Sequence, residues 1–196
     1  MKRIFTPFIF FVAINIVAAS CSRKVTRIDT DKQVDISGRW NNTDSRMTAE
    51  QLTDDVLRAV WLSNSMQAKG GQKPVVICGF VDNKSHEHIE AETFVKDLEQ
   101  AFVQTQKVRL VQGGKKREEL RSERADQQTN ATTATMKKFG MEVGADYIMQ
   151  GSINSIVDAH KKEKVVYYQV NLELTDMQTN EVVWIGDKKI AKYVKN

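Results

Sequence analysis

Cysteine is scarce in this chain, which has only Cys21 and Cys78 among its 196 residues. A small secreted fold held together by several disulfides is therefore excluded. The chain is also long enough to do without such bonds. After a short leader, about 150 ordered residues could bury roughly 70% of their unfolded surface, so the fold needs neither a disulfide nor a structural metal.

A strong excess of one charge is missing as well. The formal net charge is +4, and two of the positive charges, Lys2 and Arg3, lie at the start of the chain, which leaves an excess of only +2 elsewhere. This excess is too small to indicate a nucleic-acid-binding protein. The sequence also lacks a glycine-rich phosphate loop and a Gly-x-Ser-x-Gly nucleophile elbow. With 41% hydrophobic and 28% charged residues, the composition fits one globular domain with a short appendage.

No apolar run is long enough to span a membrane. The run from Ile4 to Val17 has about 14 residues, follows a basic start and ends in small residues, which is typical of a secretory signal peptide over 1–20. The stretch Val17-Ala-Ala-Ser-Cys21 resembles a bacterial lipobox, with Ala18 where a leucine is usual. This resemblance implies that Cys21 is acylated and becomes the first residue of a lipoprotein. The alternative is an ordinary signal peptide with a coincidental cysteine.

The residues after Cys21 predict where such a lipoprotein resides. Stable anchoring needs more than one acyl chain, which a triacylated cysteine provides. Ser22, in place of an aspartate, resembles the outer-membrane lipoproteins of Gram-negative bacteria, so we expect an outer-membrane anchor with the domain facing the periplasm. Residues 21–36 show no apolar period and are expected to form a solvated tether. Extended at ~3.4 Å per residue, it would reach roughly 50 Å.

The last third of the chain has the clearest secondary-structure pattern. Between 166 and 174, apolar residues occupy every second position, the period of a strand with one buried face. Strands are expected over 144–158, 164–176 and 181–190, and the short polar connections between them predict an antiparallel meander.

The upstream pattern alternates helices and strands. Thr48-Ala-Glu-Gln51 matches a capping box, so a helix is expected to start there, after an ordered loop at 35–45, and to end near Asn64. The elements expected next are a buried strand at 75–81, a helix at 88–106, a strand at 108–111, a solvated helix at 115–128 and a helix at 132–143. A strand, helix and strand in this order predict a parallel pair. The predicted fold is an α/β three-layer sandwich, with a mixed sheet of about five strands and helices on both faces.

Few residues have the chemistry of a catalytic or metal site. His86 and His88 are two apart and would point the same way on an extended segment. A catalytic zinc needs a third protein ligand, and the sequence places none nearby, so a polar loop is the preferred interpretation and no metal or cofactor is expected. Cys78 lies in an apolar run and is expected to be a small buried hydrophobic residue rather than a nucleophile.

Several stretches resemble the LpoB family, whose members are outer-membrane lipoproteins that activate penicillin-binding proteins. The similarity runs from about Asp35 to Tyr193. The stretches that carry it are Ser37-Gly-Arg-Trp-Asn-Asn-Thr-Asp-Ser45, Lys73-Pro-Val-Val-Ile77, Val81-Asp-Asn-Lys-Ser85, Glu87-His-Ile89, Gly144-Ala-Asp-Tyr147, Gly151-Ser-Ile-Asn-Ser-Ile156, Tyr168-Gln-Val-Asn-Leu-Glu-Leu174 and Val183-Trp-Ile-Gly186. The resemblance implies an LpoB-like globular domain over 37–196.

The resemblance also implies a function without catalysis, namely binding and stimulating a bifunctional class A peptidoglycan synthase close to peptidoglycan. Candidate partner-binding residues are Arg39, Trp40, Asp44, Asp82 and Asn83. Arginine and tryptophan are enriched at protein interfaces, although Trp40 could equally cap the core. The tether is short compared with those of the best-known members.

Two other hypotheses stay open at this point. One is an accessory or structural subunit of an outer-membrane secretion complex, because curli-type pore proteins share a related α/β domain. Against it, the chain has no long amphipathic hairpin that could form a barrel wall. The other is a metal-dependent periplasmic hydrolase that uses His86 and His88. The paired lysines along the chain could meet anionic lipid headgroups or cell-wall carboxylates, but most of these segments also contain acidic residues and are typical of a solvated surface.

Overall fold

The computed structural model describes residues 25–29, 32–132, 134 and 142–195. The expected signal peptide at 1–20, Cys21 and most of the helix expected at 132–143 lie outside the described residues. The chain divides into two compact units, residues 1–32 and 33–196, and the second contains every described helix and strand. Among the residues that the structure describes, no helix has the length and apolar character needed to cross a membrane.

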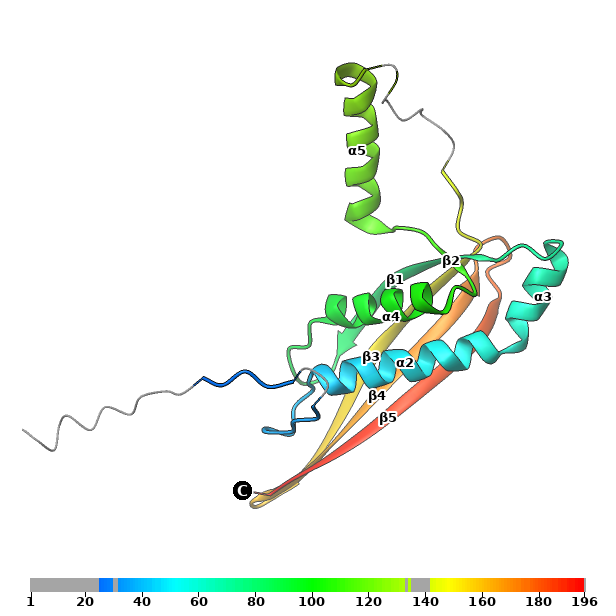
Figure 1. The fold of residues 1–196 in the computed structure, drawn as a ribbon. Helices are drawn as coiled ribbons and strands as arrows, with labels where there is room; N and C mark the ends of the chain where they lie inside the picture. The colour runs from blue at the N-terminus through cyan, green and yellow to red at the C-terminus, as the bar shows by residue number, and fades with distance from the viewer. Residues whose placement is uncertain (1–24, 30–31, 133, 135–141, 196) are drawn as a thin grey trace, which may run out of the picture. The chain divides into compact units, whose positions relative to one another are not determined.

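A single five-stranded sheet organises the second unit (Figure 1). Its strands are β1 (Val75–Lys84), β2 (Arg109–Leu110), β3 (Tyr147–His160), β4 (Glu163–Asp176) and β5 (Val182–Lys195). The spatial order is β2-β1-β3-β4-β5, with β1 parallel to β2 and β3, and with β3, β4 and β5 antiparallel to one another. This confirms the expected α/β fold with a mixed sheet, a parallel pair and a C-terminal meander.

The first described helix, α2 (Asn42–Arg58), begins earlier than the sequence predicted. Its N-cap is Asn41, whose side chain accepts a hydrogen bond from the backbone of Asp44, and the Asp44 carboxylate accepts one from the backbone of Asn41. The predicted start at Thr48 is wrong, because the Asn41 capping box satisfies the free amide groups first. Thr48 instead faces the core and is fully buried.

A second difference is a break in the helix at Ala59, where a continuous helix to Asn64 was expected. Ala59 is extended, and α3 (Val60–Ala68) starts in a new direction. The Trp61 indole N–H donates to the Val56 carbonyl at 2.6 Å, a carbonyl that an unbroken helix would pair with the amide of Val60. The break therefore buries Trp61 and leaves Val60 exposed.

The remaining helices follow the prediction more closely. Helix α4 (Ala91–Thr105) buries Phe94, Leu98 and Phe102. Helix α5 (Gly114–Asn130) has no buried residue, as expected for a solvated helix.

The core lies between the sheet and the helices α2 and α4, which pack side by side on one of its faces (Figure 1). The side chains of β4 that point there are buried, as the alternation predicted; they are Val166, Tyr168, Val170, Leu172 and Leu174. On the opposite face the chain near Gly113 covers Ile77 of β1, but the side chains of β4 and β5 that point there are largely exposed. The described helices therefore form one layer over the meander and leave its other face open.

One end of the meander extends beyond the parallel part of the sheet. The last residue pair between β1 and β3 is Lys84 with Asn154, whereas β3, β4 and β5 continue to His160, Glu163 and Lys195. This three-stranded ribbon ends in a tight turn at Lys161, which has a positive φ of 54°. The chain enters the domain beside this ribbon.

Candidate functional site

The sequence-predicted partner-binding residues lie mainly where segment 33–41 joins the ribbon. Six side chains that we refer to as the junction cluster connect this segment to the sheet. They are Asp35, Trp40, Asp44, Glu87, Tyr168 and Lys192.

The ammonium group of Lys192 is the charged centre of the junction cluster. It forms ion pairs with Asp35 at 2.7 Å and Asp44 at 2.5 Å, and it donates to the Arg39 carbonyl at 3.0 Å. Burial lowers the pKa of Lys192, but the hydrogen bonds to the two carboxylates outweigh burial and hold the pKa above its usual value. The hydrogen bond from Lys192 likewise lowers the pKa of Asp35. One buried cation thus joins β5 to both the entering segment and the N-terminus of α2.

Trp40 packs onto the core beside this charged centre. Its ring meets Phe94 and Tyr168 edge to face, at centroid distances of 6.5 and 5.5 Å. Its backbone N–H donates to Glu87 at 3.2 Å. Of the two roles considered for Trp40, the structure supports the core-capping one, with the ring only half-buried.

Glu87 links its own loop to two other segments of the chain through its side chain. One oxygen accepts the Tyr168 hydroxyl at 2.5 Å and lies 3.3 Å from Nε2 of His86, while the other accepts the Trp40 N–H. Burial and the bond to Glu87 both raise the pKa of Tyr168. Nδ1 of His86 is 2.6 Å from Oγ of Ser155, which ties the loop to β3.

The order Ser155, His86, Glu87 contains the side chains of a nucleophile, a base and a carboxylate. The Ser155 oxygen also accepts the backbone N–H of His86 at 2.9 Å, and Glu87 is occupied by Tyr168 and Trp40. These bonds hold the loop on the ribbon, so the arrangement is a structural network.

The other predicted residues occupy different positions around this network. Asn83 organises the loop, because its amide donates to the carbonyl of Glu87 at 2.8 Å and its oxygen accepts from Ser85. Arg39 and Asp82 are exposed, and Asp82 lies on the open face opposite Ser152. The structure therefore brings Trp40, Asp44 and Asn83 into one connected network and leaves Arg39 at its edge.

Gly38 allows the segment to approach β5 closely. Its φ is +67°, and a Cβ atom at this position would lie 2.2 Å from Cγ2 of Val194. A side chain is therefore excluded both by backbone conformation and by space.

The two histidines proposed as metal ligands have separate partners. His88 is exposed and contacts Glu90 at 2.6 Å, while His86 contacts Ser155 and Glu87. In the described part of the chain, no three His, Cys, Asp or Glu side chains are placed to hold a metal ion. Cys78 is a buried free thiol, and burial raises its pKa to about 12, which opposes formation of a reactive thiolate.

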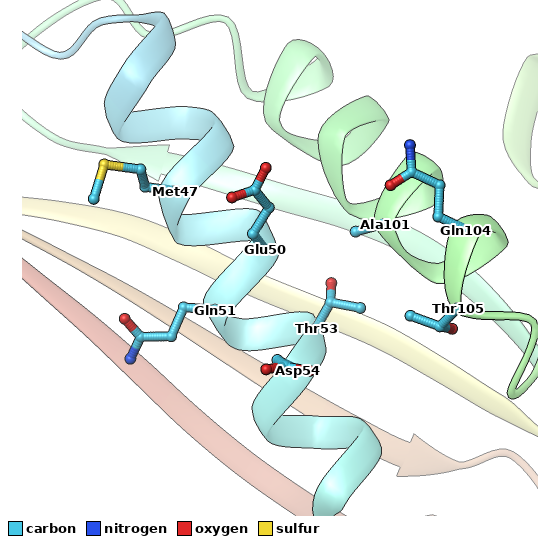
Figure 2. A pocket seen from close by; sticks show the side chains of 8 residues that line it. All are labelled: Met47, Glu50, Gln51, Thr53, Asp54, Ala101, Gln104 and Thr105. Atoms are coloured by element: carbon cyan, nitrogen blue, oxygen red, sulfur yellow. The ribbon is translucent and has the colours of Figure 1, made fainter. Parts of the chain in front are cut away.

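A shallow groove of about 590 Å³ lies between α2 and α4, away from the junction cluster (Figure 2). Figure 2 shows Glu50 and Thr53 of α2 on the side that faces Ala101 of α4. The carboxylates that line the groove, Glu50 and Asp54, already pair with Arg46 and Arg58 on the same helix. Its lining therefore has little unmet charge to offer a ligand.

Sequence reasoning missed Glu87, Tyr168 and Lys192 as parts of the site. One signal could have identified Lys192, because it falls between Ile190 and Val194 on the core-facing side of a strand. A cation at such a position requires a buried partner. The identity of that partner was not available from spacing, since Asp35 is 157 residues away.

Comparisons with known proteins identify the family. A family model described as peptidoglycan-synthase activator LpoB matches residues 44–190. The C-terminal domain of LpoB from Salmonella enterica is a similar solved structure, with 19% identity, a TM-score of 0.43, and coverage of 75% of this chain and 98% of that chain. The same domain from Escherichia coli has 18% identity and a TM-score of 0.43, and the match covers 75% of this chain and 98% of that chain.

A third similar structure is lipoprotein GNA1162 from Neisseria meningitidis, with 12% identity, a TM-score of 0.40, and coverage of 61% of this chain and 83% of that chain. No curated protein sequence matches. Because the family model spans most of the chain, from α2 into β5, the chain belongs to the LpoB family of peptidoglycan-synthase activators.

Proposed function

We propose that this protein is a lipoprotein of the outer membrane that binds and stimulates a bifunctional class A penicillin-binding protein, without catalysing a reaction itself. The observation that carries the proposal is the family match over residues 44–190, which covers α2 and most of the sheet. The lipobox-like stretch that ends at Cys21 supports the anchor, and the part of the expected 21–36 tether that precedes segment 33–41 would connect the anchor to the domain.

The junction cluster gives this proposal a structural basis. A tethered activator must present its domain while the N-terminal segment is held to a membrane. Here the segment is attached through Lys192, Trp40 and Gly38 to β5, the core and the ribbon. These packed and charged contacts would therefore bear a force applied to the tether before that force acted on α2.

Stimulation would work by differential affinity. A bound protein favours one conformation of its partner only as far as it binds that conformation more tightly. The Ser155 oxygen accepts the backbone N–H of His86, and Glu87 accepts from Tyr168 and Trp40, which fits a binding role better than a hydrolytic one.

The test adds the purified full chain, in a nonionic detergent, to each purified bifunctional synthase of the same organism. Lipid II consumption and crosslinking are followed over time. We expect a saturable rate increase with one synthase. The matched variants are Arg39→Ala, which removes an exposed candidate contact, and Arg109→Ala, which removes an exposed arginine at the far edge of the sheet.

A loss of stimulation with Arg39→Ala alone would place the contact at the junction. If the chain binds and stimulates none of the synthases, the proposed function is wrong and the assembly-subunit hypothesis becomes the better one.

A further inference from the structure

The open face of the ribbon carries an exposed apolar surface that the junction cluster does not use. Residues directly opposite each other in neighbouring strands point to the same face of a sheet. The observed pairs place Ile156 opposite Tyr167, Tyr167 opposite Ala191, and Val165 opposite Tyr193. These five side chains lie in two adjacent rows across β3, β4 and β5, in which Asp158 is the β3 member of the second row, and we refer to the five as the ribbon patch.

The ribbon patch is unusually exposed for its composition. Ile156 is 70% exposed, Tyr167 50% and Tyr193 61%. The rest of the open face is more polar, because the neighbouring row contains Asn154, Gln169 and Lys189. Exposed apolar side chains gathered in one place, with tyrosine among them, are typical of protein interaction surfaces.

Charge is concentrated around the ribbon patch. Residues 33–196 contain equal numbers of basic and acidic residues, so the domain as a whole is neutral. Around the patch, the open side of the ribbon and its turn carry four exposed lysines and three acidic residues, Asp158, Glu163 and Asp187, and Asp187 lies 3.6 Å from Lys189. The lysines are Lys161, Lys162, Lys189 and Lys195. The rim therefore has a basic excess in a domain with no net charge.

The opposite face of the same ribbon is fixed by the junction cluster. Val166 and Tyr168 are completely buried there, and Tyr168 is bonded to Glu87 and packed on Trp40. The ribbon patch is thus presented by strands whose other side is already packed. A surface held in its binding conformation loses little entropy when a partner docks.

We propose that the ribbon patch docks onto the synthase, at a surface with an apolar centre and a mainly acidic rim. This inference rests on the proposed function and adds to it the surface of contact and the chemistry of the partner. The basic rim of the patch favours a partner with an acidic rim, because opposite charges attract. The exposed side chains of Ile156, Tyr167 and Tyr193 favour an apolar centre on the partner.

A membrane surface fits this patch less well than a protein does. Lipid-binding surfaces are clusters of Lys and Arg that face anionic headgroups. Here Asp158 and Glu163 lie among the lysines, and Glu163 bonds to both Lys195 and the Tyr193 hydroxyl, whose pKa it raises. A protein partner can meet these mixed charges individually.

The experiment measures binding of the full chain to the synthase that it stimulates, by biolayer interferometry at low and high salt. Ile156→Ser and Tyr167→Ser remove the apolar centre, and a combined Lys161→Glu and Lys162→Glu variant reverses part of the rim. The matched control is Ile185→Ser, on the same face and equally exposed at 66%, but at the other end of β5. Unchanged melting temperatures confirm that each variant folds.

We expect Ile156→Ser and Tyr167→Ser each to weaken binding at least tenfold and to reduce stimulation in parallel, whereas Ile185→Ser behaves as wild type. The lysine variant should weaken binding mainly at low salt, because screening already removes its contribution at high salt. If both centre variants bind like wild type while wild type still stimulates, the docking surface lies elsewhere and the inference is wrong, although the proposed function stands.

Two further outcomes identify another occupant and would overturn the inference. In the first, the variants lose binding to phosphatidylglycerol vesicles but keep binding to the synthase. In the second, wild type sediments as a dimer, the variants sediment as monomers, and synthase binding is unchanged. If wild type binds no synthase at all, the proposed function fails and the inference fails with it.

Discussion

Replacing Lys192 with methionine is expected to destabilise the domain by about 3 kcal/mol. The Lys192 and Asp44 side chains are each only 10% exposed, so their ion pair is largely removed from water. Breaking such a pair typically costs about 3–5 kcal/mol, because the remaining charge is buried without its partner. The lower value applies here, because Asp44 keeps its bond to the Asn41 amide and Asp35 keeps access to water. Methionine preserves the packing of the aliphatic stem.

The assay is urea unfolding of wild type and variant. The free energies of unfolding are compared with one shared m-value, the slope of the free energy against urea concentration. Lys189→Met is the matched control, since Lys189 is the same residue type on the same strand but 70% exposed, with Asp187 at 3.6 Å. Its removal should cost about 0.5 kcal/mol or less. A combined Lys192→Met and Asp44→Asn variant should be more stable than Lys192→Met alone, because the buried unpaired charge is gone.

The effect of Lys192→Met should also depend on pH in a defined direction. The pKa of Lys192 is raised in the folded state, so its contribution is complete below its ordinary value of 10.5 and is lost as pH rises through the folded value. The pKa of Asp35 is lowered, so its share is complete above 3.8 and is lost as pH falls through the folded value. The difference between wild type and variant should be constant at neutral pH and shrink at both extremes. A cost no larger than that of Lys189→Met would refute the reasoning.

Two further predictions concern the core and the segment that enters it. Gly38→Ala should destabilise the domain by about 2 kcal/mol or more, because it combines a positive φ with a clash against Val194, whereas Gly70→Ala, at a φ of +62° in open space, should cost only about 1 kcal/mol. Cys78, whose pKa is raised to about 12 from 9.0, should make wild type lose about 1.4 kcal/mol per pH unit as pH rises above 9, and Cys78→Ala should remove that slope. Chemical unfolding at pH 7, 9 and 10.5 measures both effects.

Either result can contradict its prediction. Equal costs for the two glycine variants would mean that the chain at Gly38 is not pressed against β5. An alkaline slope that persists unchanged in Cys78→Ala would mean that the thiol is not buried in the folded protein.

The strands of the meander were predictable because their information is local. In β4 the alternation of apolar and polar residues predicts which side chains are buried. A one-residue shift in register would move all of the apolar side chains to the exposed face. The observed burial of Val166 to Leu174 follows this pattern. The short polar connections then leave antiparallel pairing as the simplest geometry.

Helix starts were less predictable because capping chemistry occurs more than once in this segment. Asn41 with Asp44 and Thr48 with Gln51 both have the spacing of a capping box. The structure uses the first, where Asn41 also bonds to Asp35 and Asp44 to Lys192. Asp35 is near Asn41 in the sequence, but Lys192 comes from a distant part of the chain, so the local pattern did not show that the first box has this additional ion pair.

The residues of the candidate site were also only partly predictable from local sequence. The sequence drew attention to Arg39, Trp40, Asp44, Asp82 and Asn83, and the structure places Trp40, Asp44 and Asn83 within one network. The residues that connect this network come from the loop before α4 and from β4 and β5. Only pairing of the strands brings them together.

The sequence by itself determined the α/β class, the meander and the resemblance to the LpoB family, because alternation, turn residues and short shared stretches are properties of neighbouring residues. The tertiary structure decided that Trp40 caps the core, that Lys192 joins the entering segment to β5, and that one face of the ribbon stays open. These features depend on contacts between residues far apart in the chain. The free energy of such contacts comes from burial and charge pairing, which exist only after the sheet has formed.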